Sequence, residues 1–307
     1  MLAAAYAMVS FGTKSEFLLI AACAVLQMVI LATGWNILGG FAGYVNFGAA
    51  GYFAVGAYTG VALYKAFELP LPLLIAAGSC MGALLGAATG ALTLRLRGVY
   101  FSIATLAAAI ILETVVTNWS YVGGARGITV LRPTPPGIVE TYQQWLFLTM
   151  VALAIIAAGL ARYVQNSWIG RGLRALRDEE AAAESSGVPT LKLKLFATAL
   201  SGAVMSAAGA PFALLMSFIE PISAFSLNYA LSAIAMPLIG GTAHWAGPVL
   251  GALLIGSAQQ AITVTFSGAV NVLVTGLLLM VFVIVAPQGL LGLLTKLRSP
   301  KSKGENK

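Results

Sequence analysis

The sequence has few charged residues: 17 Lys and Arg and 10 Asp and Glu make up 9% of its 307 positions, against 59% hydrophobic residues. A soluble domain carries charge at roughly a quarter of its positions, because its entire surface faces water. The shortage of charge therefore excludes a soluble enzyme. The sequence also lacks a basic segment ahead of its first apolar run, so we expect no secretory signal followed by a soluble domain.

Cysteine and histidine are also scarce, with two cysteines and one histidine in the chain. Cys23 and Cys80 lie within apolar runs, where small packed side chains are expected rather than a disulfide or metal ligands. His244, beside Trp245, lies at the edge of an apolar run and is expected to cap a helix or to lie at the membrane interface. One histidine supplies neither an H-E-x-x-H motif nor a catalytic triad, so we expect no metal site and no intramembrane enzyme.

Long uncharged stretches make up most of the chain. At roughly 20 to 25 residues per crossing, they predict two, one, one, one, one and three membrane helices in turn, in residues 17–64, 69–94, 98–112, 141–161, 195–219 and 221–295. The helix that begins at residue 98 extends across Glu113 to residue 118. The predicted fold is an all-α polytopic membrane protein of about nine transmembrane helices, or roughly eight to ten, in a single transmembrane domain over residues 1–307.

Basic residues gather on one side of these predicted crossings. Three groups share that side: Arg95 and Arg97; Arg162, Arg171, Arg174, Arg177, Lys192 and Lys194; and Lys296, Arg298, Lys301, Lys303 and Lys307. The other side receives Lys65, Arg126 and Arg132, while the side of the N-terminus stays open. Because cytoplasmic loops carry the excess of Lys and Arg, we expect the loop 164–190 and the basic tail 291–307 in the cytoplasm. The net charge of +7 thus reflects topology and not nucleic-acid binding.

The longest loop on the opposite, periplasmic side covers residues 119–143. It contains Arg132 and three of the chain's prolines, which stiffen it. Exposed loops of this kind either dock a soluble partner or simply connect two helices.

Two glycine-rich stretches interrupt the apolar pattern, one in each half of the chain: residues 39–56 and 237–256. Irregular backbone at membrane depth needs protein or a water-filled cavity to satisfy it, and matched breaks in two halves point to a transport site between inverted repeats. The alternative is a pair of tight helical hairpins near the membrane surface, with glycines as C-caps. The candidate pathway residues are Gly43, Tyr44, Asn46, Gly51, Glu113, Asn228, Gly240, Gly241 and Gly247.

Glu113 has two interpretations. A carboxylate at the centre of a membrane helix costs about 2.5 to 3.5 kcal/mol on insertion, so Glu113 should face protein or water, or be neutral. It either lines the pathway or lies near the outer interface, close to Asn118, and pairs with Arg126.

Four glycines recur at every fourth position, at residues 78, 82, 86 and 90. This spacing lines them along one face of a helix. It predicts close packing against another helix, and it serves channels, carriers and pumps alike.

The loop from Asn166 to Pro189 reads NSWIGRGLRALRDEEAAAESSGVP. Leu173 and Leu176 fall on one helical face, with charges of both signs beside them, and Gly187 and Pro189 stop the helix. A short amphipathic helix between two membrane spans suits docking into a groove of a soluble protein. A solvated loop is the alternative.

This segment resembles the EAA-type coupling motif in the permease subunits of ABC importers. Residues 177–187 follow the variant of the LivM family of branched-chain amino-acid permeases: an acidic run, two alanines, three residues and a glycine. Residues 170–177, 94–106, 51–58 and 240–252 are similar to that family too, so the resemblance extends from about residue 34 to 290. The chain departs from the family at Ala181, at residues 46–49 and at Ile110. These departures leave the substrate open more than the fold.

The resemblance implies a multi-pass permease subunit of the bacterial inner membrane, carrying branched-chain amino acids or related small polar solutes. It implies a second, LivH-like permease subunit, two cytoplasmic ABC ATPases and a periplasmic solute-binding protein as partners. A helix over residues 170–187 would move as a rigid lever when the ATPases close. The ATPase-coupling residues on it are Arg171, Arg174, Arg177, Asp178, Glu179, Glu180, Ala182, Ala183 and Gly187.

The chain has no G-x-x-x-x-G-K-[ST] phosphate-binding loop, and the nearest string, residues 12–15, lacks the Gly-Lys step. We therefore expect no ATPase activity and no cofactor in this chain, with ATP and Mg²⁺ bound by the partner subunits. The alternative function is an ion-coupled secondary transporter of a small polar solute. Such a carrier would need no coupling loop and would usually have more acids within its spans.

Overall fold

The computed structural model describes residues 16–265 except 94, 95, 97, 132 and 134–140, together with residues 276, 277 and 280. Six helical stretches in this part of the chain are long and apolar enough to cross a membrane. They are residues 17–42, 71–93, 99–117, 142–166, 190–216 and 221–240. The predicted all-α, multi-pass class is confirmed. The count of about nine is not confirmed: six described helices qualify, two further described helices over residues 49–67 and 246–265 do not, and the last predicted helix lies mostly outside the described residues.

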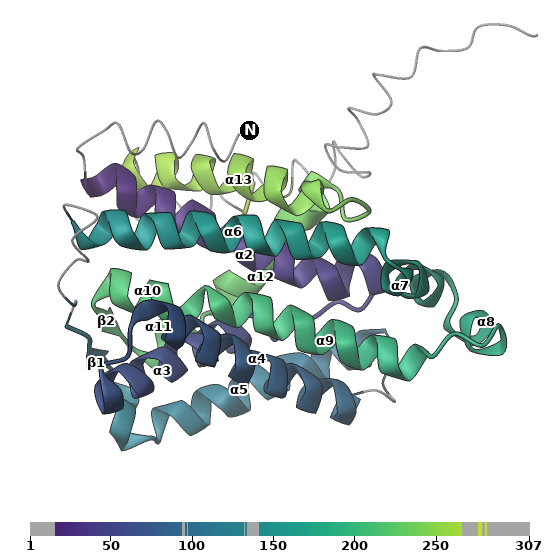
Figure 1. Ribbon diagram of the computed structural model, residues 1–307, viewed down its shortest axis with the longest axis horizontal. Coiled ribbons are helices and arrows are strands. Elements are labelled where there is room, and N and C mark those ends of the chain that lie inside the picture. Colours follow the sequence, from purple (N-terminus) through teal and green to yellow (C-terminus); the bar gives the residue numbers. More distant parts are fainter. Residues whose placement is uncertain are drawn as a thin grey trace, which may run out of the picture.

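Several of the long helices, α6 and α9 among them, run along the long axis of the molecule (Figure 1). The long ones are α2 (Glu16–Ala42), α3 (Ala49–Phe67), α4 (Leu71–Thr93), α5 (Val99–Thr117), α6 (Tyr142–Asn166), α9 (Thr190–Ala207), α12 (Leu227–Gly240) and α13 (Ala246–Thr265). Helix α2 packs against α6, α9, α12 and α13, while α4 packs along α9 and α5 contacts α3 and α4. α2 is apolar on nearly all sides, and such a helix is stable when other helices surround it.

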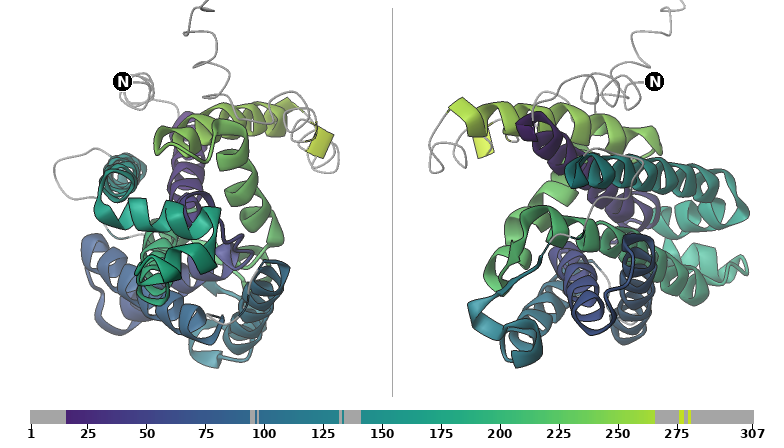
Figure 2. Two further views of the ribbon diagram at one scale, coloured as in Figure 1. Left: turned by 90° about the vertical axis from the view of Figure 1, so that its right-hand side faces the viewer. Right: turned by 60° about the vertical axis from the view of Figure 1, so that its left-hand side comes forward.

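Short elements close the two ends of the bundle. At one end, α7 (Trp168–Asp178) and α8 (Glu180–Ser185) cross the ends of the long helices (Figures 1 and 2); we call this the α7 end. At the other lie the 3₁₀ turns η1 (Ser120–Val122) and η2 (Gly124–Arg126), strands β1 (Ile128–Thr129) and β2 (Phe218–Ile219), and helices α10 (Gly209–Met216) and α11 (Pro221–Ala224). β1 pairs antiparallel with β2, with Ile128 opposite Ile219. The described part of the predicted loop 119–143 is thus folded against the segment after α10.

The predicted close packing of the α4 glycines is confirmed: Gly82, Gly86 and Gly90 face α9, and Gly78 lies nearest to Gly56 of α3. A Cβ atom at Gly82 would lie 2.5 Å from the carbonyl oxygen of Gly202, and one at Gly86 would lie 2.9 Å from the Cα of Ala199. Contacts this short leave no room for a side chain. The glycine face therefore allows the backbones of α4 and α9 to pack directly together.

A candidate coupling site at the α7 end

The predicted single helix over residues 170–187 is wrong, because the structure has two helices there. α7 ends at Asp178, Glu179 is extended (φ −160°, ψ 110°), and α8 begins at Glu180. Acidic side chains are favourable in the first turn of a helix and unfavourable in the last, so an acidic run suits a new helix start. Gly187, at φ +81°, follows the end of α8, which agrees with the predicted stop.

The apolar face of α7 is the predicted one. Leu173 and Leu176 are buried, and both lie in one cluster with side chains from α2, α5, α6 and α9. At the start of α7, the hydroxyl of Ser167 accepts a hydrogen bond from the backbone N–H of Gly170 (3.4 Å). Burial on one side and a cap at the start hold α7 across the end of the bundle.

The candidate coupling residues divide into two groups. Arg171, Arg174, Asp178, Glu179, Ala182 and Gly187 are exposed. The guanidinium of Arg174 also donates hydrogen bonds to the carbonyl oxygens of Gly170 and Gln165 (3.3 Å each). Ala183 is buried and the Glu180 side chain is only 14% exposed. The side chain of Arg177 is 35% exposed, but its guanidinium is engaged by the bundle. The first group, with the exposed part of Arg177, offers a surface to a soluble partner.

Arg177 connects α7 to the end of α2. Its guanidinium donates a hydrogen bond to the carbonyl oxygen of Gly40 (3.1 Å), and its Nε lies 3.6 Å from the carboxylate of Asp178. The stem of Arg177 packs on Gly43, where a Cβ atom would lie 2.7 Å from Arg177 Cγ. Gly43 also has φ +78°, which favours glycine. Both the space and the backbone conformation therefore call for glycine at this position.

Glu180 connects α8 to α9 and to the first glycine-rich stretch. Its carboxylate pairs with the ammonium of Lys194 and accepts a hydrogen bond from the hydroxyl of Tyr44 (2.7 Å). Lys194 Nζ also lies 4.8 Å from the centroid of the Tyr44 ring. The side chains of Lys194 and Glu180 are only 7% and 14% exposed. In such surroundings, charge pairs and cation–π contacts are stronger than in water.

The break between α2 and α3 is held by side chains of α2 and α5. The indole Nε1 of Trp35 donates to the carbonyl oxygen of Asn46 (2.8 Å), and the Asn46 side chain accepts from the backbone N–H of Gly48 (2.7 Å). The hydroxyl of Ser102 donates to the carbonyl oxygen of Val45 (2.8 Å). One turn further along α5, the hydroxyl of Thr105 accepts from the backbone N–H of residue 47 (3.1 Å). Trp35 lies seven residues before the end of α2, or about 10 Å. The chain therefore turns back into the bundle before α3 begins.

The break between α12 and α13 lies at the same end. Asn36 donates from its amide nitrogen to the carbonyl oxygen of Thr242 (3.2 Å). Gln165 accepts from the backbone N–H of Trp245 (2.8 Å) and donates to the carbonyl oxygen of residue 243 (3.3 Å). His244 accepts from the N–H of Ala246, the first residue of α13, which confirms its expected capping role. Two neighbours on α2, Trp35 and Asn36, thus hold one break each.

The positions of the predicted glycines favour the hairpin interpretation of the breaks. Gly43 and Gly241 follow the last residues of α2 and α12 and both have positive φ, at +78° and +109°. Gly240 and Gly247 allow the backbones of α12 and α13 to touch, and Gly51 packs on Ala109 of α5. These glycines act as C-caps and close contacts.

The two remaining pathway candidates lie elsewhere. Asn228 is exposed at the start of α12, at the opposite end of that helix from the second break. Glu113 lies in the last two turns of α5 and is partly buried; within the described residues, no ion pair joins it to Arg126. The structure therefore does not bring all the predicted pathway residues together.

Three residues of this site were not predicted from the sequence: Trp35, Gln165 and Lys194. Lys194 was counted only as a topology signal. It shares a helical face with Thr198 and Ser201, which follow four and seven residues later, and both of these are buried. This polar face toward the bundle was the available signal for Lys194.

Residues 17–284 match the family described as "Branched-chain amino acid transport system / permease component". The chain belongs to this family. The permease is 29% identical to the high-affinity branched-chain amino acid transport system permease protein LivM of Escherichia coli (strain K12), over 90% of this chain and 71% of that protein. The LivM protein of Salmonella typhimurium shows the same identity and coverage. A ribose import permease protein, RbsC of Haemophilus influenzae, is 28% identical over 64% of this permease and 62% of its own length. The LivM-type resemblance is thus confirmed.

Proposed function

We propose that this permease is the transmembrane subunit of an ABC importer that carries branched-chain amino acids, or related small polar solutes, across the bacterial inner membrane. Family membership and the LivM relatives support the transport class. They also disfavour the ion-coupled secondary transporter. The observation that carries the proposal is that α7 and α8 combine an exposed, mixed-charge surface with two direct connections to the first glycine-rich break.

The exposed surface is the docking site for the ATPases in this proposal. Arg171, Asp178 and Glu179 present charges of both signs, and Ala182 and Gly187 allow close approach of another backbone. A short helix pair with this composition suits a groove on a soluble subunit. Two cytoplasmic ABC ATPases would bind ATP and Mg²⁺ and occupy the surfaces on this permease and on a LivH-like second permease subunit. A periplasmic solute-binding protein would deliver the substrate at the opposite end.

The two connections give the docking surface a mechanical route into the bundle. Arg177 joins α7 to the end of α2, and Glu180 joins α8 to Tyr44 and to α9. Because Glu179 is extended between the helices, α8 can be displaced without moving α7 by the same amount. Each helix then acts on a different element.

Displacement of α8 would be transmitted through the first break to α5. Tyr44 precedes Val45, whose carbonyl oxygen accepts a hydrogen bond from Ser102 of α5. Helix α5 is the least buried of the six candidate spans, with 22% of its apolar stretch buried. A helix with so few packing contacts can shift at low cost. We propose that α5 moves with the break and that its motion opens and closes the pathway.

Purification of the tagged permease in a gentle detergent, followed by mass spectrometry, tests the proposed assembly. We expect two P-loop ATPases and a second permease subunit to copurify. Proteoliposomes containing this complex should take up a branched-chain amino acid only with ATP and the binding protein. A lone permease that takes up substrate without ATP would overturn the proposal.

A further inference from the structure

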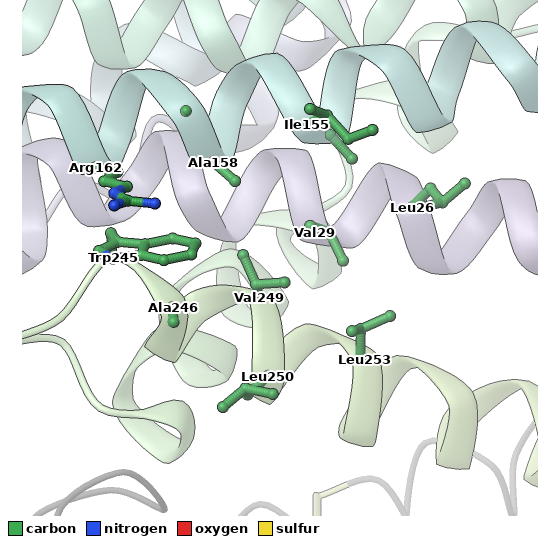
Figure 3. A pocket seen from close by; sticks show the side chains of 12 residues that line it. Leu26, Val29, Ile155, Ala158, Arg162, Trp245, Ala246, Val249, Leu250 and Leu253 are labelled. Atoms are coloured by element: carbon green, nitrogen blue, oxygen red, sulfur yellow. The ribbon is translucent and has the colours of Figure 1, made fainter. Parts of the chain in front are cut away.

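An apolar groove of about 490 Å³ runs between α2, α6 and α13, away from the coupling residues (Figure 3). Its sides are Leu26 and Val29 from α2, Ala154, Ile155, Ala158 and Gly159 from α6, and Val249, Leu250 and Leu253 from α13. Along α6 it extends from Ala154 to Arg162, or about 12 Å. Its length and lining suit a hydrocarbon chain.

A single cation stands at the α7 end of this groove. The guanidinium carbon of Arg162 lies 5.8 Å from the centroid of the Trp245 ring, and Figure 3 shows the two side chains face to face, with the apolar residues beyond them. Arg162 has no hydrogen bond or ion pair among the residues that the structure describes. The Arg162 side chain is exposed and has no counter-ion among these residues, so an anion placed here can pair with it.

A second hollow of about 430 Å³ adjoins the groove, and the two share Gly159 and Arg162. Tyr163, Asn166 and Ser167 also line it, so it offers hydroxyl and amide groups beside the guanidinium. Tryptophan and arginine at the end of a membrane helix mark the level of the lipid headgroups. The apolar part of the site thus lies at acyl-chain depth and its polar part at headgroup depth.

We propose that this groove binds an anionic phospholipid of the leaflet at the α7 end. One acyl chain would lie between α2, α6 and α13, and the phosphate would bind Arg162, with hydrogen bonds from the second hollow. Basic pockets between transmembrane helices bind anionic headgroups in this manner. Because Trp245 is held by Gln165, the lipid would also contact the loop of the second break.

Native mass spectrometry of the full complex tests the proposal, with titration of phosphatidylglycerol, phosphatidylcholine or inorganic phosphate. Arg162→Ala removes the cation and should weaken phosphatidylglycerol binding about tenfold or more, the size expected for a charge-assisted contact. Gly159→Leu should block the groove, because Gly159 lines it. The substitution should not strain the helix, since a Cβ atom at Gly159 meets nothing within 4 Å. Lys192→Ala removes an exposed cation at the same end, outside the groove, and should bind as the wild type.

Three results would overturn the proposal. The first is unchanged phosphatidylglycerol binding in both Arg162→Ala and Gly159→Leu. The second is binding of phosphatidylcholine or of inorganic phosphate that is as tight as binding of phosphatidylglycerol. The third is a photoreactive residue at position 158 that cross-links to another subunit and not to lipid, which would make the groove a protein interface. None of these readouts depends on transport.

Discussion

Glu180 of α8 forms an ion pair with Lys194 of α9, fourteen residues along the chain, where both side chains are largely shielded from water. Two charges in such a place are tolerated because each compensates the other, and the hydroxyl of Tyr44 occupies another oxygen of Glu180. The acidic run of the loop therefore does not belong wholly to the docking surface. One of its carboxylates fixes α8 to the bundle.

We expect Lys194→Met to destabilise the permease by about 2 to 4 kcal/mol, because it removes the positive charge that compensates the Glu180 carboxylate in a shielded site. The cost is below that of a fully buried charge, since Glu180 keeps 14% exposure. Thermal unfolding of the purified permease measures the effect. Lys192→Met is the matched control, because Lys192 is exposed two residues earlier.

The double substitution Glu180→Gln with Lys194→Met should be more stable than Lys194→Met alone, since it removes both charges of the ion pair. Equal melting temperatures for Lys194→Met and Lys192→Met would contradict the role of the pair.

Tyr44→Phe should reduce coupling more than stability. It deletes the hydroxyl that joins the first break to Glu180 but keeps the ring beside Phe101 and Lys194. A hydrogen bond to a charged group contributes about 1.5 to 3 kcal/mol to stability. The loss in Tyr44→Phe should be at the low end of this range, because Glu180 keeps its ion pair with Lys194. We expect ATP hydrolysis to continue while uptake per ATP falls severalfold in proteoliposomes.

Tyr100→Phe, at an exposed tyrosine at the start of α5, serves as the control for Tyr44→Phe. An unchanged ratio of uptake to ATP hydrolysis in Tyr44→Phe would remove Tyr44 from the route between α8 and α5.

Local sequence patterns predicted the parts of the fold that depend on one helix at a time. The spacing of Leu173 and Leu176 gave the buried face of α7, and the glycines of α4 gave the face that meets α9. Gly187 marked the end of α8. Each of these signals lies within a few turns of one element, where periodicity and glycine conformation are informative.

The connections between elements could not be predicted in the same way. Arg177 reaches Gly40 across 137 residues, and Asn36 reaches Thr242 across 206. No periodicity links such positions, so the inward orientation of Arg177 appears only when α7 is placed across the end of α2. The break at Glu179 was missed because the resemblance treats the acidic run as one continuous motif.

Gly187→Asp tests the docking surface. A side chain here meets nothing within 4 Å, so the bundle should insert and fold normally. The positive φ and a negative charge after the end of α8, where helix dipoles favour cations, should disturb the exposed face of α8. We expect normal amounts in the membrane fraction but ATP hydrolysis uncoupled from uptake.

Gly187→Asn separates the two effects of this substitution, since asparagine is similar in size to aspartate, neutral and tolerant of positive φ. If charge at the docking surface matters, Gly187→Asn should stay closer to the wild type. Normal coupled uptake in Gly187→Asp would remove Gly187 from the coupling surface.

Gly43→Ala tests the contact between α7 and the first break. The added Cβ atom would lie 2.7 Å from Arg177 Cγ, so Arg177 must move away from Gly40. The alanine would also have to adopt φ +78°. Gly98→Ala is the matched control, because Gly98 also has positive φ (+57°) but a Cβ atom there meets nothing within 4 Å. Alanine in the left-handed helical region costs about 1 to 2 kcal/mol, and Gly98, with ψ −127°, lies outside that region, where alanine costs more. Gly98→Ala therefore controls for backbone strain, and only Gly43→Ala also displaces Arg177, so uptake per ATP should fall further in Gly43→Ala. Equal uptake per ATP in the two variants would show that backbone strain alone explains the glycine and that α7 does not act through Gly43.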